Sequence, residues 1–439
     1  MDVDSVKRFL LDFHARVLLD LKTRTTVLVD TRKIHSVIGA RRVGKTYLLF
    51  SKIKQLESTG ASRDQILYLN FENPVLADVT FKDFKAILEL QWSLFPSAIS
   101  KDMFIFIDEP QGIQDWELAV RGLQDEFNCH IFITGSSSRL SSKEIATALR
   151  GRALTTTLYP LSFKEFLSFK DIDVDVEHLD TKTAAIVQSH FNDFLRYGGY
   201  PEVALANNEQ EKLKILKDYY DMTFYKDIVD RYAIKNTYLI GWLMRYIASS
   251  AAKEISLNKI FNNLKSKGMK IGKNTLYEYF SALQDAFFSH ILRKFDYSFK
   301  NEEIGTPKVY LNDIGFFNLF YVEETGRRLE NIVFIYLLEI TGRNPLLHFH
   351  YWKSKTGLEV DFVISEGQRV KMVIQSCTAL TDNITREREM NGLIACLKEF
   401  DLDEGIIVTE NEERVENIQG KIIKIYPAWK WLMNEGVIN

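Results

Sequence analysis

The residues best suited to chemistry form a glycine-bounded loop. They are Gly39, Ala40, Arg41, Arg42, Val43, Gly44, Lys45 and Thr46, and they match the pattern G-x-x-x-x-G-K-T. Such a loop turns backbone N–H groups toward an anion, and the helix after it aims its dipole at the same point. Lys45 would reach the β- and γ-phosphates of ATP, and the Thr46 hydroxyl would ligate Mg²⁺. A chance glycine-rich turn is the alternative, but all four defining positions are filled in the right context.

Two adjacent carboxylates, Asp108 and Glu109, follow the apolar run 103–107. Such a run is typical of a buried parallel strand. Asp108 would hold Mg²⁺ through water, and Glu109 would polarise the attacking water as general base. A solvated loop could also carry two acids, but their combination with the phosphate loop favours catalysis.

A third polar segment follows the apolar run 131–133 and reads T-G-S-S-S at 134–138. A polar side chain at the tip of a neighbouring strand can hold the attacking water and sense the γ-phosphate. Ser136 is the first candidate for this role and Thr134 the second. An ordinary serine-rich turn is the alternative.

The elements that must position these residues follow from hydrophobic periodicity. Helical spacing predicts helices over 5–22 and 45–56. Apolar runs predict strands at 34–38, 66–69, 103–107, 131–134 and 153–158. Strands that alternate with helices indicate an α/β fold with a doubly wound parallel sheet.

Composition excludes several classes of protein. The 439 residues are 46% hydrophobic and 26% charged, with a formal net charge of -3, which indicates a globular chain without a global basic signal. Cys129, Cys377 and Cys396 form no CxxC pair, so neither a disulfide framework nor a zinc site is indicated. No apolar stretch is long enough for a bilayer and no signal peptide is evident, so we expect no membrane partner and a cytoplasmic protein.

Together these motifs resemble the AAA+ ATPases, in the archaeal and bacterial group that joins an ATPase module to a nuclease-like C-terminal domain. The resemblance spans almost the whole chain. Besides the three segments above, it rests on Y-L-N-F-E at 68–72, L-R-G-R at 149–152, P-L-S-F-K-E-F at 160–166 and G-G-Y-P at 198–201. It implies an AAA+ core over 1–158, a helical lid over 159–207, a winged-helix-like region over 208–300 and a PD-(D/E)XK-like domain over 301–439.

The resemblance also implies a homo-oligomer in which an arginine of one subunit reaches the γ-phosphate held by the next. Arg152 or Arg150 would be this arginine finger. Two surface arginines in a loop are the alternative. Arg196 is a weaker candidate for a sensor in the lid.

The region 254–296 suggests a winged helix, with helices over 255–264 and 274–287 and a wing strand over 291–295. Lys265, Lys267, Lys270 and Lys273 cluster at the turn, which suits phosphate contacts. Glu278 and Asp285 weaken a groove-reading role, so a protein partner remains the alternative to nucleic acid.

The C-terminal region resembles the PD-(D/E)XK restriction-endonuclease fold. Glu330 in a helix and Asp361 on a strand match its first two acidic positions. Its E-x-K position reads Gln375-Ser376-Cys377, which lacks one carboxylate and the ammonium that a magnesium nuclease needs. A displaced lysine, such as Lys353, Lys355 or Lys371, is the alternative. We therefore expect recognition rather than cleavage.

These patterns favour Mg²⁺-dependent ATP hydrolysis that drives a conformational or oligomeric switch acting on nucleic acid. One rival is a signalling ATPase whose ATP state controls assembly with a protein partner. The other is an ATP-gated nuclease.

Overall fold

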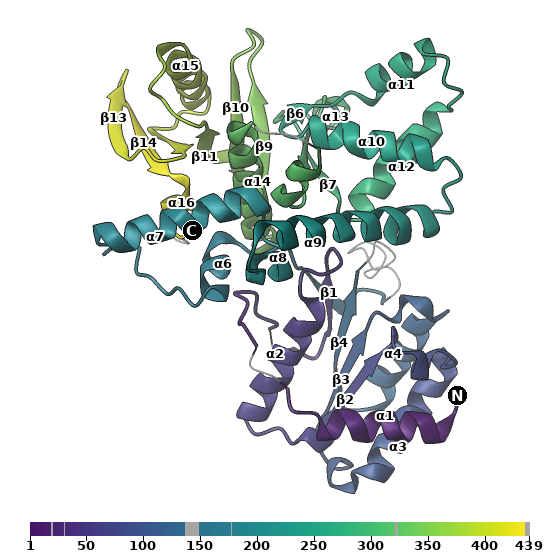
Figure 1. Ribbon diagram of the computed structural model, residues 1–439. Coiled ribbons are helices and arrows are strands. Elements are labelled where there is room, and N and C mark those ends of the chain that lie inside the picture. Colours follow the sequence, from purple (N-terminus) through teal and green to yellow (C-terminus); the bar gives the residue numbers. More distant parts are fainter. Residues whose placement is uncertain (19–20, 30, 137–148, 177, 321–323, 435–439) are drawn as a thin grey trace. The chain divides into compact units, whose positions relative to one another are not determined.

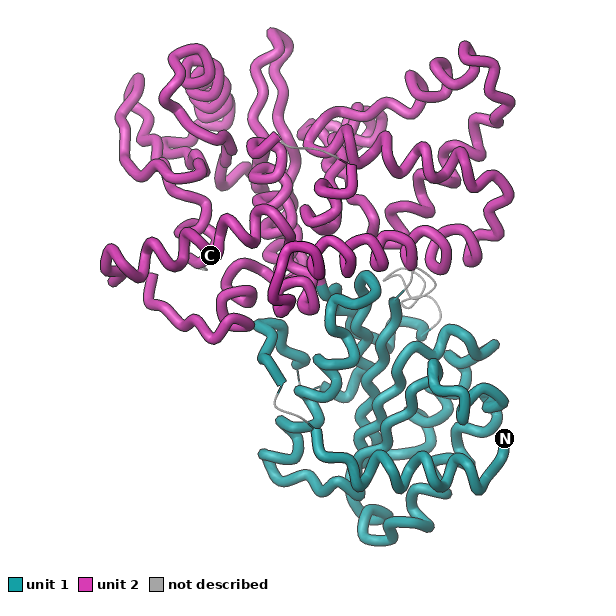
Figure 2. The backbone as a smooth tube through the Cα atoms, in the orientation of Figure 1, with its two compact units in different colours: residues 1–158 teal, residues 159–439 magenta. Residues whose placement is uncertain are grey.

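The computed structural model describes residues 1–18, 21–29, 31–136, 149–176, 178–320 and 324–434. Two compact units make up the chain, residues 1–158 and residues 159–439 (Figure 2). Within the described residues, no helix is both long and apolar enough to cross a membrane.

Unit 1 is built on a five-stranded parallel sheet with the strand order β2-β3-β4-β1-β5. Its strands are β1 (Ile34–Ile38), β2 (Ile66–Asn70), β3 (Met103–Asp108), β4 (Cys129–Gly135) and β5 (Ala153–Thr157). Every residue of β1 is buried, and β3 and β4 are nearly so, because helices cover both faces of the sheet. The predicted strands are confirmed to within about two residues at each end.

Helices α2 (Lys45–Ser58) and α4 (Trp116–Glu126) flank the sheet on opposite faces (Figure 1). Right-handed crossovers explain this placement, because the chain moves across the sheet in opposite directions after β1 and after β3. Helices α1 (Val3–Ala15) and α3 (Phe84–Leu94) complete the unit.

The first helix is shorter than the predicted span 5–22. Its buried stripe, Val6, Leu10 and Phe13, is complete at Ala15. Val17, two residues beyond the helix, is 83% exposed, and burial against a core is what stabilises most helices.

Unit 2 begins with helices and continues into two sheets. The helices before the first sheet are α6 (Phe163–Phe169), α7 (Thr181–Tyr197), α8 (Pro201–Leu205), α9 (Glu209–Met222) and α10 (Thr237–Ser249), with a π-helix at Thr223–Asp230. An antiparallel sheet in the order β6-β8-β7 follows. It comprises β6 (Lys253–Glu254), β7 (Ser289–Leu292) and β8 (Lys308–Leu311), with α11 (Leu257–Ser266), α12 (Lys273–Asp285) and α13 (Phe299–Ile304) between them.

The second sheet of unit 2 is mixed and six-stranded, in the order β13-β14-β12-β11-β10-β9. Its strands are β9 (Leu347–Lys353), β10 (Glu359–Glu366), β11 (Arg369–Ser376), β12 (Glu404–Thr409), β13 (Arg414–Ile418) and β14 (Lys421–Pro427). The associated helices are α14 (Thr325–Arg343), α15 (Asn383–Glu399) and α16 (Ala428–Trp431). Leu393 and Leu397 of α15 join Val360 and Ile407 of the sheet in one apolar core, which holds β10 and β11 rigidly in place.

Candidate active site and a buried ion cluster

The register of the strands brings the predicted polar residues of unit 1 together at the carboxyl ends of the strands. Asp108 at the end of β3 pairs with Thr134 of β4, which in turn pairs with Val37 of β1. The phosphate loop leaves β1 directly beyond this row. Ligands of open α/β sheets bind at the carboxyl ends of the strands, and all of these side chains lie at those ends.

The phosphate loop has the backbone that its glycines permit. Gly39 (φ 152°) and Gly44 (φ 101°) adopt positive φ, and Gly44 caps α2. A Cβ at Gly39 would lie 2.2 Å from the carbonyl oxygen of Leu158, so no other residue fits there. Arg42 (φ 66°) also adopts positive φ, and Arg41 forms an ion pair with Glu72 at 3.0 Å. The loop therefore leads into α2 as an anion site requires.

Lys45 is a buried cation at the carboxyl ends of these strands. Its ammonium donates to the carbonyl oxygens of Gly39 (3.1 Å) and Ala40 (3.0 Å) and lies 3.5 Å from a Glu109 oxygen. These contacts close the loop around its own lysine. A phosphate that enters must compete for the ammonium with Glu109.

The two adjacent carboxylates have different surroundings. Burial raises the pKa of Asp108, although its oxygens accept hydrogen bonds from Thr134, Thr46 (2.8 Å) and Tyr68 (2.9 Å). Burial also acts on Glu109, but the Lys45 charge and hydrogen bonds from Gln111 and Ser136 outweigh it and lower the pKa. Neighbouring carboxylates whose pKa values are pushed apart are a mark of acid–base sites.

Ser136 contacts the predicted base. Its N–H and its hydroxyl donate to the same Glu109 oxygen, at 2.9 and 2.8 Å. Thr134 instead bonds Asp108 and the backbone N–H of Glu109. Ser137 and Ser138, the last residues of this motif, lie outside the described residues.

Arg152 lies away from the phosphate loop of its own chain. It precedes Ala153, which pairs with Ile34, the first residue of β1. The loop leaves the other end of β1, about 13 Å along the strand. The Arg152 guanidinium forms an ion pair with Asp125 at 2.6 Å, and Arg150 (φ 51°) is exposed in the preceding turn. Arg152 therefore lies beside the start of β1, away from the phosphate loop of its own chain.

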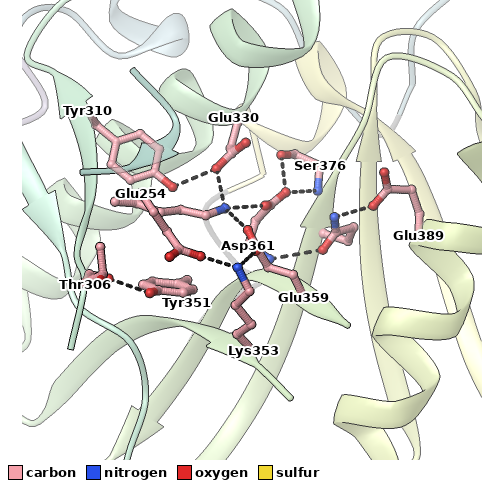
Figure 3. Close-up of polar contacts among 12 residues, drawn as sticks. Glu254, Thr306, Tyr310, Glu330, Tyr351, Lys353, Glu359, Asp361, Ser376 and Glu389 are labelled. Atoms are coloured by element: carbon pink, nitrogen blue, oxygen red, sulfur yellow. Dashed lines mark hydrogen bonds and ion pairs between the residues drawn. The ribbon is translucent and has the colours of Figure 1, made fainter. Parts of the chain in front are cut away.

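Unit 2 holds a buried ion cluster in which the predicted Glu330 and Asp361 meet a lysine that the sequence did not indicate. Lys308, the first residue of β8, lies 3.0 Å from Glu330 of α14, 3.0 Å from Asp361 and 2.7 Å from Glu359 of β10. Figure 3 shows the side chains of Glu330, Glu359 and Asp361 gathered at this cluster. Of the lysines considered from sequence, Lys353 contacts only the rim of the cluster, through Glu359, and also pairs with Glu254, whereas Lys371 pairs with Glu366. The missing ammonium thus comes from a different sheet.

The third predicted position also contributes to this cluster. The Gln375 side-chain oxygen accepts the backbone N–H of Asp361 at 3.0 Å, and its amide group donates to Glu389 of α15. Ser376 donates its N–H (3.0 Å) and its hydroxyl (2.8 Å) to Asp361. Burial raises the pKa of the Cys377 thiol to about 12, so this residue stays neutral and cannot replace a lysine.

A pocket of about 800 Å³ adjoins the cluster. Its lining includes Lys308, Arg327, Glu330, Asp361 and Ser376. The carboxylates are thus buried against the protein but face a space that can admit a ligand.

Comparison with known proteins agrees with a nucleotide site in unit 1. An AAA domain model matches residues 31–167. Two domains of unknown function, DUF8612 and DUF4143, match residues 188–325 and 325–431. An AAA domain implies binding and hydrolysis of ATP with Mg²⁺.

The uncharacterized protein MJ1544 of Methanocaldococcus jannaschii is 37% identical to this chain over 408 residues, which cover 91% of this chain and 88% of that protein. The chain belongs to the family of MJ1544. A second relative in this family, an uncharacterized protein of Haemophilus influenzae, is 32% identical over 81% of this chain and 86% of its own length. Neither relative supplies a target.

Among solved structures, the Aeropyrum pernix ORC1 protein in complex with DNA aligns with 70% of this chain and 88% of its own. The identity is 13% and the TM-score 0.29. At this TM-score the likeness carries no information about function.

Proposed function

We propose that this chain is a Mg²⁺-dependent ATPase that uses hydrolysis to switch its conformation or its assembly. The observation that carries the proposal is the convergence of two pairs, Lys45 with Glu109 and Thr46 with Asp108, at 3.5 and 2.8 Å. A lysine, a hydroxyl and two carboxylates at the mouth of a phosphate loop are the groups that phosphoryl transfer to water requires.

The residues present fit ATP and Mg²⁺. Loop N–H groups and Lys45 would bind the phosphates, while Thr46 and Asp108 would hold the ion, whose charge offsets that of the phosphate oxygens. A γ-phosphate that draws Lys45 away from Glu109 removes the charge that lowers the pKa of this carboxyl. Glu109 then becomes a stronger base at the moment when its substrate is bound, and Ser136 keeps it in position.

Nucleic acid is the proposed target, through a winged-helix-like region. Its elements run α10, β6, α11, α12 and β7, and β8, which lies beyond the predicted limit at residue 300, pairs with β6 and β7 to complete a three-stranded antiparallel sheet. Lys265, Lys267, Lys270 and Lys273 are all exposed around the turn between α11 and α12. Lysines at the start of such a helix suit contacts with backbone phosphates.

The test is ATPase turnover with and without a panel of DNA and RNA, alongside sizing with ATP and with ADP. Turnover that rises with nucleic acid, and falls again as salt is added, supports a switch that acts on nucleic acid. The variant with all four turn lysines changed to glutamine should lose this rise and keep basal turnover. ATP-dependent assembly without any response to nucleic acid would instead favour the signalling ATPase.

For residues 301–439 we propose a restriction-endonuclease-like fold reused for recognition. An ATP-gated nuclease is the second candidate function. The Lys308 cluster supports it, because an ammonium lies beside the carboxylates of Glu330 and Asp361. We expect no cleavage of DNA or RNA by the full chain with ATP and Mg²⁺ or Mn²⁺. Cleavage that disappears in Asp361→Ala would establish the nuclease instead, whereas cleavage that survives this change would come from a contaminant.

A further inference from the structure

The ion cluster of unit 2 already contains a cation at its centre. Lys308 is 3% exposed, and its ammonium lies within 3.0 Å of oxygens from Glu330, Glu359 and Asp361. Burial alone would lower the pKa of this lysine, but the Asp361, Glu330 and Glu359 charges outweigh it and hold the pKa well above its usual value. The lysine is therefore charged at any physiological pH.

Several of the oxygens that a divalent metal would need already accept hydrogen bonds from the protein. One Asp361 oxygen accepts from Lys308, and the other accepts both hydrogen bonds from Ser376. One Glu330 oxygen accepts from Lys308 and from the Tyr310 hydroxyl at 2.7 Å. Within the described residues no group of three or more His, Cys, Asp and Glu side chains is arranged to hold a metal ion. The cluster therefore does not fit the magnesium that a nuclease fold implies.

We propose that the Lys308 ammonium is the permanent cation of this site and excludes divalent metals from it. This ion pair connects the two sheets of unit 2, because Lys308 belongs to β8 of the three-stranded sheet and Asp361 belongs to β10 of the six-stranded sheet. A ligand of the 800 Å³ pocket thus meets carboxylates that already share an internal cation. A metal in this pocket would have to displace the ammonium from these carboxylates.

The alternative is that Lys308 is a bystander beside a metal site that fills in solution. The two differ in how Mn²⁺ affects stability, because a ligand that binds only the folded state raises its melting temperature. Mn²⁺ is the probe, and the full-length chain carries Asp108→Asn throughout to remove the carboxylate expected to hold Mg²⁺ in unit 1. This readout is independent of ATP hydrolysis, so a failed ATPase proposal leaves it intact.

With Lys308 present, Mn²⁺ should leave the melting temperature unchanged. Lys308→Met should melt lower without metal, because it leaves buried carboxylates unpaired, and Mn²⁺ should raise its melting temperature by several degrees. Adding Asp361→Asn to Lys308→Met should abolish that rise. Lys353→Met is the matched control, since it removes a lysine that contacts Glu359 from the rim, and it should show no response to Mn²⁺.

Two results would overturn the proposal. The first is a rise with Mn²⁺ while Lys308 is present that Asp361→Asn removes, which would put the metal beside the lysine. The second is a folded Lys308→Met chain whose melting temperature does not change with Mn²⁺. In that case the ammonium is not what keeps a metal out of the site. Should Lys308→Met not fold, Lys308→Gln keeps hydrogen-bond donors without the charge, and the same two outcomes apply to it.

Discussion

At the scale of single residues, the nucleotide site is an arrangement of hydroxyl groups around two carboxylates. Asp108 accepts from three hydroxyls, those of Thr46, Tyr68 and Thr134, while Glu109 is held by Ser136 and Lys45. Because the carboxylates have separate partners, substitutions should separate metal binding from base catalysis.

Glu109→Gln should bind ATP and hydrolyse it about 10²- to 10⁴-fold more slowly, since the amide keeps the shape and loses the base. Nucleotide binding by fluorescence titration and turnover by phosphate release measure the two effects separately. If binding and turnover fell together, Glu109 would be a structural residue.

Tyr68→Phe should raise the Mg²⁺ concentration needed for half-maximal turnover by about 10-fold, with little loss at saturating Mg²⁺. The ring stacks on Phe13 (4.7 Å between centroids), so phenylalanine keeps the packing and removes only the hydroxyl that orients Asp108. Partners of metal ligands typically change metal affinity by about 10- to 100-fold.

The control for this prediction is Tyr47→Phe, since Tyr47 lies beside Thr46 in the sequence but is 63% exposed. Equal Mg²⁺ dependence in both variants would contradict a positioning role for Tyr68. A lower turnover at every Mg²⁺ concentration would point to a packing defect instead.

At the scale of elements, one buried carboxyl joins the end of α7 to the turn after β8. The two Asp313 oxygens accept the N–H groups of Gly199 and Gly315, each at 2.7 Å. Gly198 adopts φ 82°, and a Cβ there would lie 1.9 Å from Asp313. The G-G-Y-P motif therefore serves a tight backbone approach between distant segments.

Burial raises the pKa of Asp313 to about 7, although the two N–H groups oppose the rise. The unfolded chain releases this proton near pH 3.9, so between about pH 4 and about pH 7 the folded state holds a proton that the unfolded state has lost. This group's contribution to stability therefore falls as pH rises through that window.

Asp313→Asn should remove this contribution, which urea denaturation across the window would measure. Asp382→Asn is the matched control, because Asp382 is an exposed helix cap whose pKa is lowered by the Thr385 N–H. Its contribution has the opposite sign and is lost as pH falls. An unchanged pH dependence in Asp313→Asn would mean that Asp313 is ionised throughout.

At the scale of the whole molecule, an arginine finger at Arg152 would connect activity to assembly. It lies at the amino ends of the strands, whereas the phosphate loop follows the carboxyl end of β1. An arginine finger at this position would therefore act between chains. Its ion pair with Asp125 would have to open when subunits assemble.

Arg152→Ala should lower turnover by about 10³-fold with little change in ATP affinity. Mixing it with Lys45→Ala chains should restore part of the activity, because some interfaces then pair an intact loop with an intact finger. Verified mixed oligomers without any recovery would argue against a finger at Arg152, and the same experiment with Arg150→Ala distinguishes the two candidates.

Local patterns in the sequence determined the strands of unit 1 and the candidate phosphate site. Strands that are buried between two layers of helices consist of consecutive apolar residues, and a phosphate loop needs glycines and a lysine at fixed spacing. Lys45, Thr46, Asp108 and Glu109 could therefore be named in advance, although their catalytic roles remain to be tested.

Tertiary structure alone decided which charges meet. Tyr68 reaches Asp108 across 40 positions, and Lys308 reaches Asp361 across 53. No periodicity or spacing encodes such pairs, because they depend on which strands become neighbours in a sheet and on how separate sheets come together. The sequence could show that Cys377 is not a lysine, but only the folded chain shows that Lys308 supplies the ammonium.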